Sequence, residues 1–168
     1  MSALITLQAS IVSEINTLLP GLKSCRAHPG RFTRDELKEM IIKSPSAHVG
    51  VPKLYGGPSS GGITKIRAKC ITVFSATNTT RPKKLSGDDA VMQMVGVFLA
   101  KLPTLNFGAG ILPPADIEAD NLYQSGSKDG VALWAVHWTS PVSIVPELTD
   151  EGALSPSLYY SYVPDVGP

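Results

Sequence analysis

Apolar side chains recur every three or four positions over the first 22 residues, a spacing that predicts an amphipathic helix. They are Leu4, Leu7, Ile11, Ile15, Leu18 and Leu22. A Pro-Gly pair at 20–21 ends the pattern. A second helical pattern begins after Ser86, carries two aspartates in its first turn and stops at Pro103. Between the two, the capping-box pair Thr33 and Glu36 predicts a shorter helix.

Four other stretches have the composition of strands. Residues 47–55 and 63–76 are rich in β-branched side chains and flank GGPSSGG (56–62), which predicts a hairpin with a long flexible loop. Residues 117–123 and 131–145 predict a second hairpin around SGSKDG. In the last of these strands, the residues predicted to face the core are Trp134, Val136 and Trp138.

The order of these elements defines the expected fold class. Helices and hairpins follow one another without strict strand–helix alternation, which favours an α+β layer over a doubly wound sheet. We expect a mixed or antiparallel sheet of about four strands, in two hairpins, packed against two longer helices. Residues 1–145 are predicted to form one domain, and the proline-rich and tyrosine-rich residues 146–168 to form an extended C-terminal arm.

Charge is low overall and unevenly distributed. Charged residues make up 17% of the chain, below the usual ~25%, which indicates that part of the surface is covered in use. Residues 1–101 carry 14 Lys/Arg and six Asp/Glu, whereas residues 102–168 carry Lys128 against eight acids. These opposite halves either neutralise each other within one fold or form faces that attract between copies, as in a ring.

Basic residues gather around the second strand of the first hairpin. Lys65, Arg67 and Lys69 alternate and are predicted to share one face. The connection that follows adds three more, Arg81, Lys83 and Lys84. Three interpretations stay open: a solvated sheet face, contact with phosphates, or contact with the acidic half of a neighbouring copy. Sequence-specific DNA recognition is not expected, because neither interleaved aromatics nor a helix-turn-helix accompanies the basic residues.

Groups that carry chemistry are few and scattered. The three histidines, His28, His48 and His137, lack metal-ligand spacing, and no nucleophile elbow or phosphate-binding loop occurs. The alternating acids Asp116, Glu118 and Asp120 fit a solvated strand edge better than a cation site. The two cysteines form no CxxC motif and suit a reducing compartment. We therefore expect no enzyme, no cofactor, no metal and no membrane span.

The densest aromatic cluster lies near the C-terminus, in LYYSYVPDVGP (158–168). Chain ends are usually polar and frayed, so a cluster of this kind indicates a segment held on a partner. Tyrosine suits such a contact because it combines apolar area with a polar tip. The predicted contact residues are Tyr159, Tyr160, Tyr162 and Pro164.

Four segments give the chain a family likeness: ITLQASIVSEINTLLPGL, SPSAHVGV, ADNLYQSGSKDGVALWAVHWTSP and SYVPDVGP. With them, the chain resembles the tail-terminator, or short tail-completion, proteins of Mu-like bacteriophages. The resemblance implies a structural virion protein that assembles in the host bacterial cytoplasm into a ring, expected to be a homohexamer. The ring would end tail-tube polymerisation at the head-proximal end and join the tail to head-completion proteins.

The same resemblance implies the partners of the chain. They would be other copies of itself, the tail tube protein, the head-completion or neck protein, and DNA that passes through the lumen without sequence recognition. The basic hairpin end would then point into the lumen or onto the tube, and the arm would reach a neighbouring subunit. The alternative function is a non-specific DNA-binding or adaptor protein of virion assembly.

Overall fold

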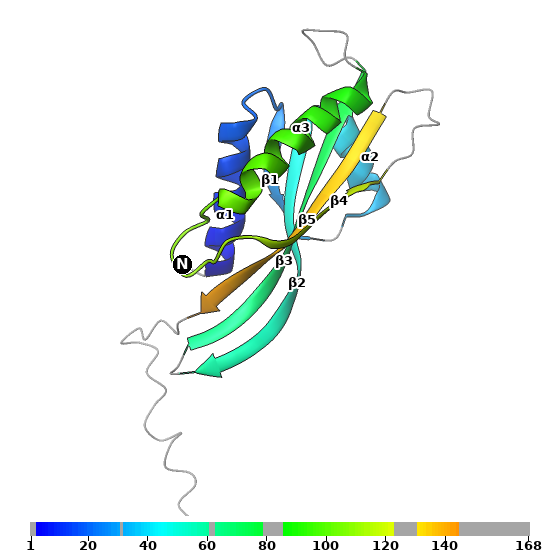
Figure 1. Ribbon diagram of the computed structural model, residues 1–168. Helices are drawn as coiled ribbons and strands as arrows, with labels where there is room; N and C mark the ends of the chain where they lie inside the picture. The colour runs from blue at the N-terminus through cyan, green and yellow to red at the C-terminus, as the bar shows by residue number, and fades with distance from the viewer. Residues whose placement is uncertain (1–2, 31, 61–62, 79–85, 123–130, 145–168) are drawn as a thin grey trace, which may run out of the picture.

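The computed structural model describes residues 3–30, 32–60, 63–78, 86–122 and 131–144. Five strands form one mixed sheet in the order β1-β2-β3-β5-β4 (Figure 1). The strands are β1 (Ser24–His28), β2 (Ser46–Ser60), β3 (Ile63–Thr77), β4 (Ala115–Asn121) and β5 (Val131–Ile144). The helices are α1 (Ala3–Leu18), α2 (Arg34–Ile42), α3 (Gly87–Lys101) and the short 3₁₀ helix η1 (Leu102–Thr104). Among the described strands only β1 and β2 pair in parallel, so the fold is α+β, as the sequence predicts.

The main hydrophobic core lies between one face of the sheet and the helices α1 and α3. The α1 residues that are fully buried there are Leu7, Ile11 and Ile15. Phe98 of α3 packs between two rings of the sheet, with centroids 5.5 Å from Phe74 and 5.7 Å from Trp138. Trp138 is buried and Trp134 half-buried on this same face, which confirms the predicted orientation of β5.

Helix α2 covers the opposite face of the sheet, but only at one end. Its residue Met40 is buried against Val73, Leu133 and Ala135 in a second, smaller cluster. The predicted capping box is present, because the Glu36 carboxylate accepts from the Thr33 N–H at 2.7 Å and the Thr33 hydroxyl accepts from the Glu36 N–H. Figure 1 shows α2 behind the sheet and α3 in front of it.

Three buried serines fix the C-terminal end of α2 to the sheet. The Ser75 hydroxyl donates to the carbonyl of Met40 at 3.1 Å. Its oxygen lies 2.9 Å from the Ser44 hydroxyl and 2.8 Å from the Ser46 hydroxyl. Polar groups without water are stable only when hydrogen-bonded, so the three hydroxyls and the helix-end carbonyl satisfy one another.

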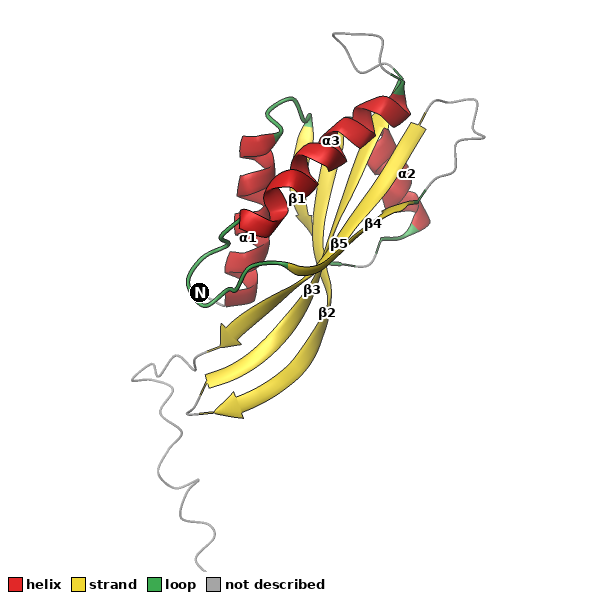
Figure 2. Cartoon of the chain, viewed as in Figure 1, coloured by secondary structure: helices red, strands yellow, loops and turns green. Residues whose placement is uncertain are grey.

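The other end of the sheet extends beyond the helices. β2 and β3 each have 15 residues, about 50 Å of extended chain, and Figure 2 shows the ends of β2, β3 and β5 projecting past α1 and α3. Two hydrophobic side chains on this projection are exposed, Leu54 (47%) and Ile63 (39%). The projection therefore presents both of its faces without cover from the described helices.

Two expectations about this sheet are wrong. The fifth strand, β1, was not expected, because SCRAH contains polar residues and only five positions and so lacks a clear alternating pattern. GGPSSGG is not one long loop, since β2 continues to Ser60 and β3 begins at Ile63. A close approach of the two strands accounts for glycine at position 57, because a Cβ there would stand 2.5 Å from the Lys65 carbonyl oxygen.

Candidate interaction surface

The uncovered face of the β2–β3 hairpin carries a group of basic residues around one tyrosine. We call it the basic face, and its members are Lys53, Tyr55, Lys65, Arg67 and Lys69. Lys53 pairs with Lys69 and Tyr55 with Arg67 across the two strands, so the partners point to the same side. The residues between them on β3 turn toward the α1–α3 core, where Ala68 is fully buried. The predicted alternation on β3 is therefore confirmed.

Two cations contact the ring of Tyr55. The Lys53 Nζ lies 4.7 Å from the centre of the Tyr55 ring and the Arg67 Cζ lies 5.8 Å from it. Each such contact at a surface contributes about 0.5–1 kcal/mol. The two contacts give the ring a defined orientation, so it forms a flat apolar platform within a positively charged surface.

A cavity of about 220 Å³ opens beside this platform. Its polar lining consists of Tyr55, Arg67 and Lys69 on the basic side, Asp116 and Glu118 of β4, and His137 and Thr139 of β5. A bulge in β4 contributes, because Asp116 adopts φ 51° where the pairing with β5 shifts between Ala115 and Glu118. The volume is below the ~300 Å³ typical of small-molecule sites and fits a single side chain.

His137 also lines this cavity. It lies on the face opposite Trp138 and is partly exposed, with Nε2 3.6 Å from the Asp120 carboxylate. Burial lowers the pKa of His137, and the nearby Asp120 charge opposes that shift. Its buried Nδ1 has no hydrogen-bond partner among the described residues. The cavity is thus lined by groups of both charges and by an imidazole ring.

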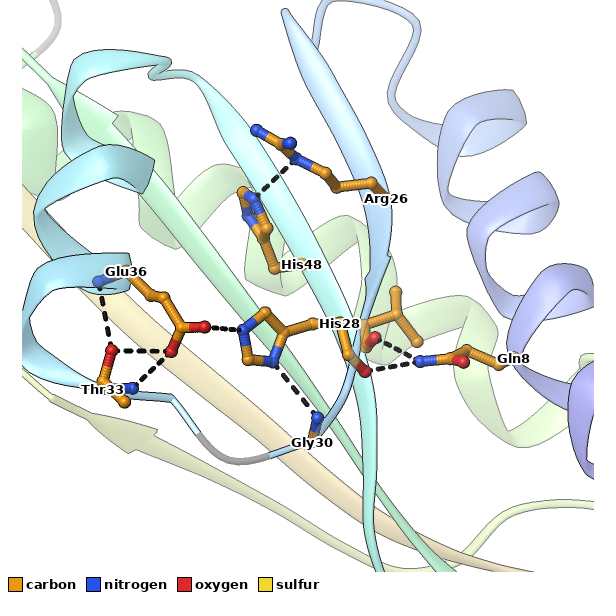
Figure 3. Close-up of polar contacts among 8 residues, drawn as sticks. Gln8, Arg26, His28, Gly30, Thr33, Glu36 and His48 are labelled. Carbon is orange, nitrogen blue, oxygen red and sulfur yellow. Dashed lines mark hydrogen bonds and ion pairs between the residues drawn. The ribbon is translucent and has the colours of Figure 1, made fainter.

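A second polar cluster lies where α2 meets the edge strand β1 (Figure 3). The Gly30 N–H donates to His28 Nδ1 at 3.2 Å, which leaves the other ring nitrogen, Nε2, facing the Glu36 carboxylate at 3.1 Å. The Gln8 side chain donates to the carbonyls of His28 and Val49, both at 2.8 Å. The cluster therefore joins α1, β1, β2 and the start of α2.

His48 lies beside this cluster and accepts from Arg26 Nε at 3.2 Å. Burial, with the positive charge of Arg26, lowers the pKa of His48 to about 4, so its ring is neutral at pH 7. Hydrogen bonds from Thr33 lower the pKa of Glu36 to about 2. Neither of these two groups titrates near neutral pH, and both line a small cavity of about 190 Å³.

The two cysteines also lie in unreactive surroundings. Burial raises the pKa of Cys25 to about 11 and that of Cys70 to about 12. The thiolate is the nucleophilic and metal-binding form, and it is not populated at such values near neutral pH. Within the described part of the chain, no group of three or more His, Cys, Asp or Glu side chains is arranged to hold a metal ion.

The structure brings together half of the basic residues that the sequence singles out. Lys65, Arg67 and Lys69 share the basic face, whereas Arg81, Lys83 and Lys84 lie outside the described residues. The predicted arm and its contact residues Tyr159, Tyr160, Tyr162 and Pro164 also lie outside them. Sequence reasoning missed Lys53 and Tyr55, because their position depends on the pairing register of β2 with β3.

No protein-family model matches the chain, and a search of curated proteins finds no match. Among the described residues, no helix is long and apolar enough to cross a membrane.

Proposed function

We propose that the chain is a self-assembling structural protein of a phage virion, a tail terminator. Its ring ends polymerisation of the tail tube at the head-proximal end and joins the tail to head-completion proteins. The proposal combines the family likeness of the sequence with one structural observation, the β2–β3 hairpin that projects beyond the helices. No described helix covers this end of β2, β3 and β5, so contact with a neighbouring copy would bury apolar surface that is otherwise exposed there.

The chemistry of the projection supports this role. Ile63 exposes apolar area at its end and Leu54 does so further back along β2, and the basic face lies along one side. On the same side of the sheet, β4 adds the exposed acids Asp116, Glu118 and Asp120. A surface with both signs of charge side by side favours head-to-tail contacts, and such contacts close into rings when the rotation permits.

The basic face also supports one alternative, non-specific binding of DNA. Lys and Arg on one surface attract phosphates, with an affinity that falls steeply as salt rises. However, the carboxylates of Asp116 and Glu118 share a cavity with Arg67 and Lys69, and they repel a phosphate backbone at that point. Binding to random duplex, measured at two salt concentrations, separates this alternative from self-assembly.

Complementation of a phage that lacks the gene tests the proposal. Without the chain, electron micrographs should show tubes of uncontrolled length and heads without tails. Supplying the wild-type chain should restore tubes of uniform length joined to heads. Normal tails joined to heads in the absence of the chain would rule out the terminator function.

A further inference from the structure

Positive charge is concentrated on the basic face beyond what the described structure neutralises. Lys53 and Lys69 are direct cross-strand partners, and like charges in that position destabilise a sheet. Lys65 and Arg67 extend the same row toward the end of the hairpin. None of these four cations forms an ion pair with another described residue. The arrangement is therefore suited to an anionic partner.

The sequence supplies a segment of matching chemistry. The 24 residues that follow Ile144 contain four acids and no Lys, Arg or His. The acids are Glu147, Asp150, Glu151 and Asp165. The same segment contains Tyr159, Tyr160 and Tyr162. Fully extended, 24 residues reach up to about 80 Å, so length does not limit where the segment binds.

We infer that the basic face is the docking site for residues 146–168 of a second copy of the chain. The inference rests on the proposed self-assembly and names the segment that passes between subunits. Its acids neutralise Lys53, Lys65, Arg67 and Lys69, and one of its tyrosines enters the 220 Å³ cavity beside Tyr55. The face is then occupied by residues 146–168 of another copy rather than by the tail tube or by DNA in the lumen.

The cavity suits a tyrosine better than an aliphatic or acidic side chain. Its lining offers the donors Arg67 and Lys69 and the acceptors Asp116 and Glu118. A phenol hydroxyl both donates and accepts, so it can bond to both kinds of group. The Tyr55 ring, held by Lys53 and Arg67, provides an aromatic surface on which a second ring packs.

The direction of β5 favours a second copy over the same chain. Ile144 pairs with Thr64 at the end of the projection, and Ser143 pairs with Lys65. β5 therefore runs along the basic face toward the end of the hairpin, and the chain reaches Ile144 while moving away from the cavity and α2 (Figure 1). Docking on its own domain would require the chain to reverse immediately after this point.

Two charge-reversed full-length chains test the inference. The face variant carries K65E/R67E/K69E, and the arm variant carries E147K/D150K/E151K. In each variant the face and the arm carry charge of the same sign and repel each other. Each variant alone should therefore associate at least about tenfold more weakly than the wild type. An equimolar mixture of the two variants should recover the wild-type association. The acidic arm of the face variant can bind the basic face of the arm variant, and the basic arm of the arm variant can bind the acidic face of the face variant.

Light scattering of each variant and of the equimolar mixture gives the mass. The matched control, K23E/K38E/K101E, makes the same change in charge at exposed lysines away from the face and should associate like the wild type. Circular dichroism and the unfolding midpoint confirm that each variant is folded. If either variant keeps the wild-type mass, or the mixture fails to recover it, the inference is wrong.

The outcomes separate this inference from the proposed function. A face variant that still associates but no longer binds duplex DNA would assign the face to nucleic acid and overturn the inference. A stable dimer whose variants behave as described would support arm exchange and contradict the ring. If the mixture of variants recovers association but the phage that lacks the gene still makes normal tails, the docking site is supported and the terminator function is rejected.

Discussion

Gly30 and Gly50 lie in van der Waals contact across the β1–β2 edge of the sheet. A Cβ on Gly50 would stand 2.8 Å from the Cα of Gly30, and a Cβ on Gly30 would stand 2.9 Å from the Cα of Pro52. Gly30 also has φ +112°, a conformation that side chains disfavour. This close approach lets the chain leave β1 next to β2 and turn toward α2, so it positions the cluster around His28 and Glu36.

The contact predicts a strong effect of Gly50→Ala. The two nearest atoms both belong to the backbone of Gly30, so the added methyl cannot be accommodated by a side-chain rotation, and we expect a loss of about 2–3 kcal/mol in the free energy of unfolding. Urea titration followed by circular dichroism measures it. A variant within 0.5 kcal/mol of wild type, on the order of an ordinary surface change, would show that the approach is not tight.

Gly96→Ala is the matched control, because the same substitution at this position should raise the free energy of unfolding. Gly96 is exposed within α3, and a Cβ there would meet nothing within 4 Å. Alanine is favoured over glycine within a helix by roughly 0.5–1 kcal/mol, so this change should raise stability. The same urea titration compares the two variants directly, and a loss of stability for Gly96→Ala would contradict the described exposure of α3.

The buried serines predict a cost for Ser75→Ala. Removal of this hydroxyl takes a donor from the Met40 carbonyl and a partner from Ser44 and Ser46, so we expect a loss of about 1–2 kcal/mol. Thr72→Val is the control on the same strand, because the buried Thr72 hydroxyl has no partner among the described residues. Thr72→Val should be neutral or stabilising, and equal losses for both variants would argue against the serine network.

His48 predicts a dependence of stability on pH. Its folded pKa of about 4 lies below its unfolded value of 6.5, so between these values only the unfolded chain takes up the proton. Stability should therefore fall by about 2 kcal/mol between pH 7 and pH 5, through this group alone. His48→Gln keeps an acceptor for Arg26 without a titrating ring and should flatten this part of the profile. An unchanged slope in the variant would assign the dependence to other groups.

Much of the fold is predictable because local patterns and tertiary structure agree. The spacing of Leu7, Ile11 and Ile15 and the capping box at Thr33 each specify an element that the structure contains. β1 was missed because a five-residue edge strand with two exposed positions carries little pattern, and its parallel partner lies 22 positions along the chain. Its pairing depends on tertiary contacts such as the Gly30–Gly50 approach.

The basic face was predictable only in part, because some of its residues come together only through tertiary contacts. The alternation of Lys65, Arg67 and Lys69 follows from strand geometry and is visible in the sequence. Lys53 and Tyr55 join them through a register that shifts at a bulge between Gly50 and Lys53, and no local rule specifies that shift. The cavity requires in addition that β5 lie between β3 and β4, which is a property of the sheet order.

The mass of the purified full-length chain, measured by light scattering across protein concentration at low and high salt, tests self-assembly most directly. We expect the mass to rise from 17.8 kDa toward a fixed multiple of that value, and salt should shift the rise to higher protein concentration. A mass of 17.8 kDa at every concentration and at both salts would contradict assembly through the basic face and the acidic segment.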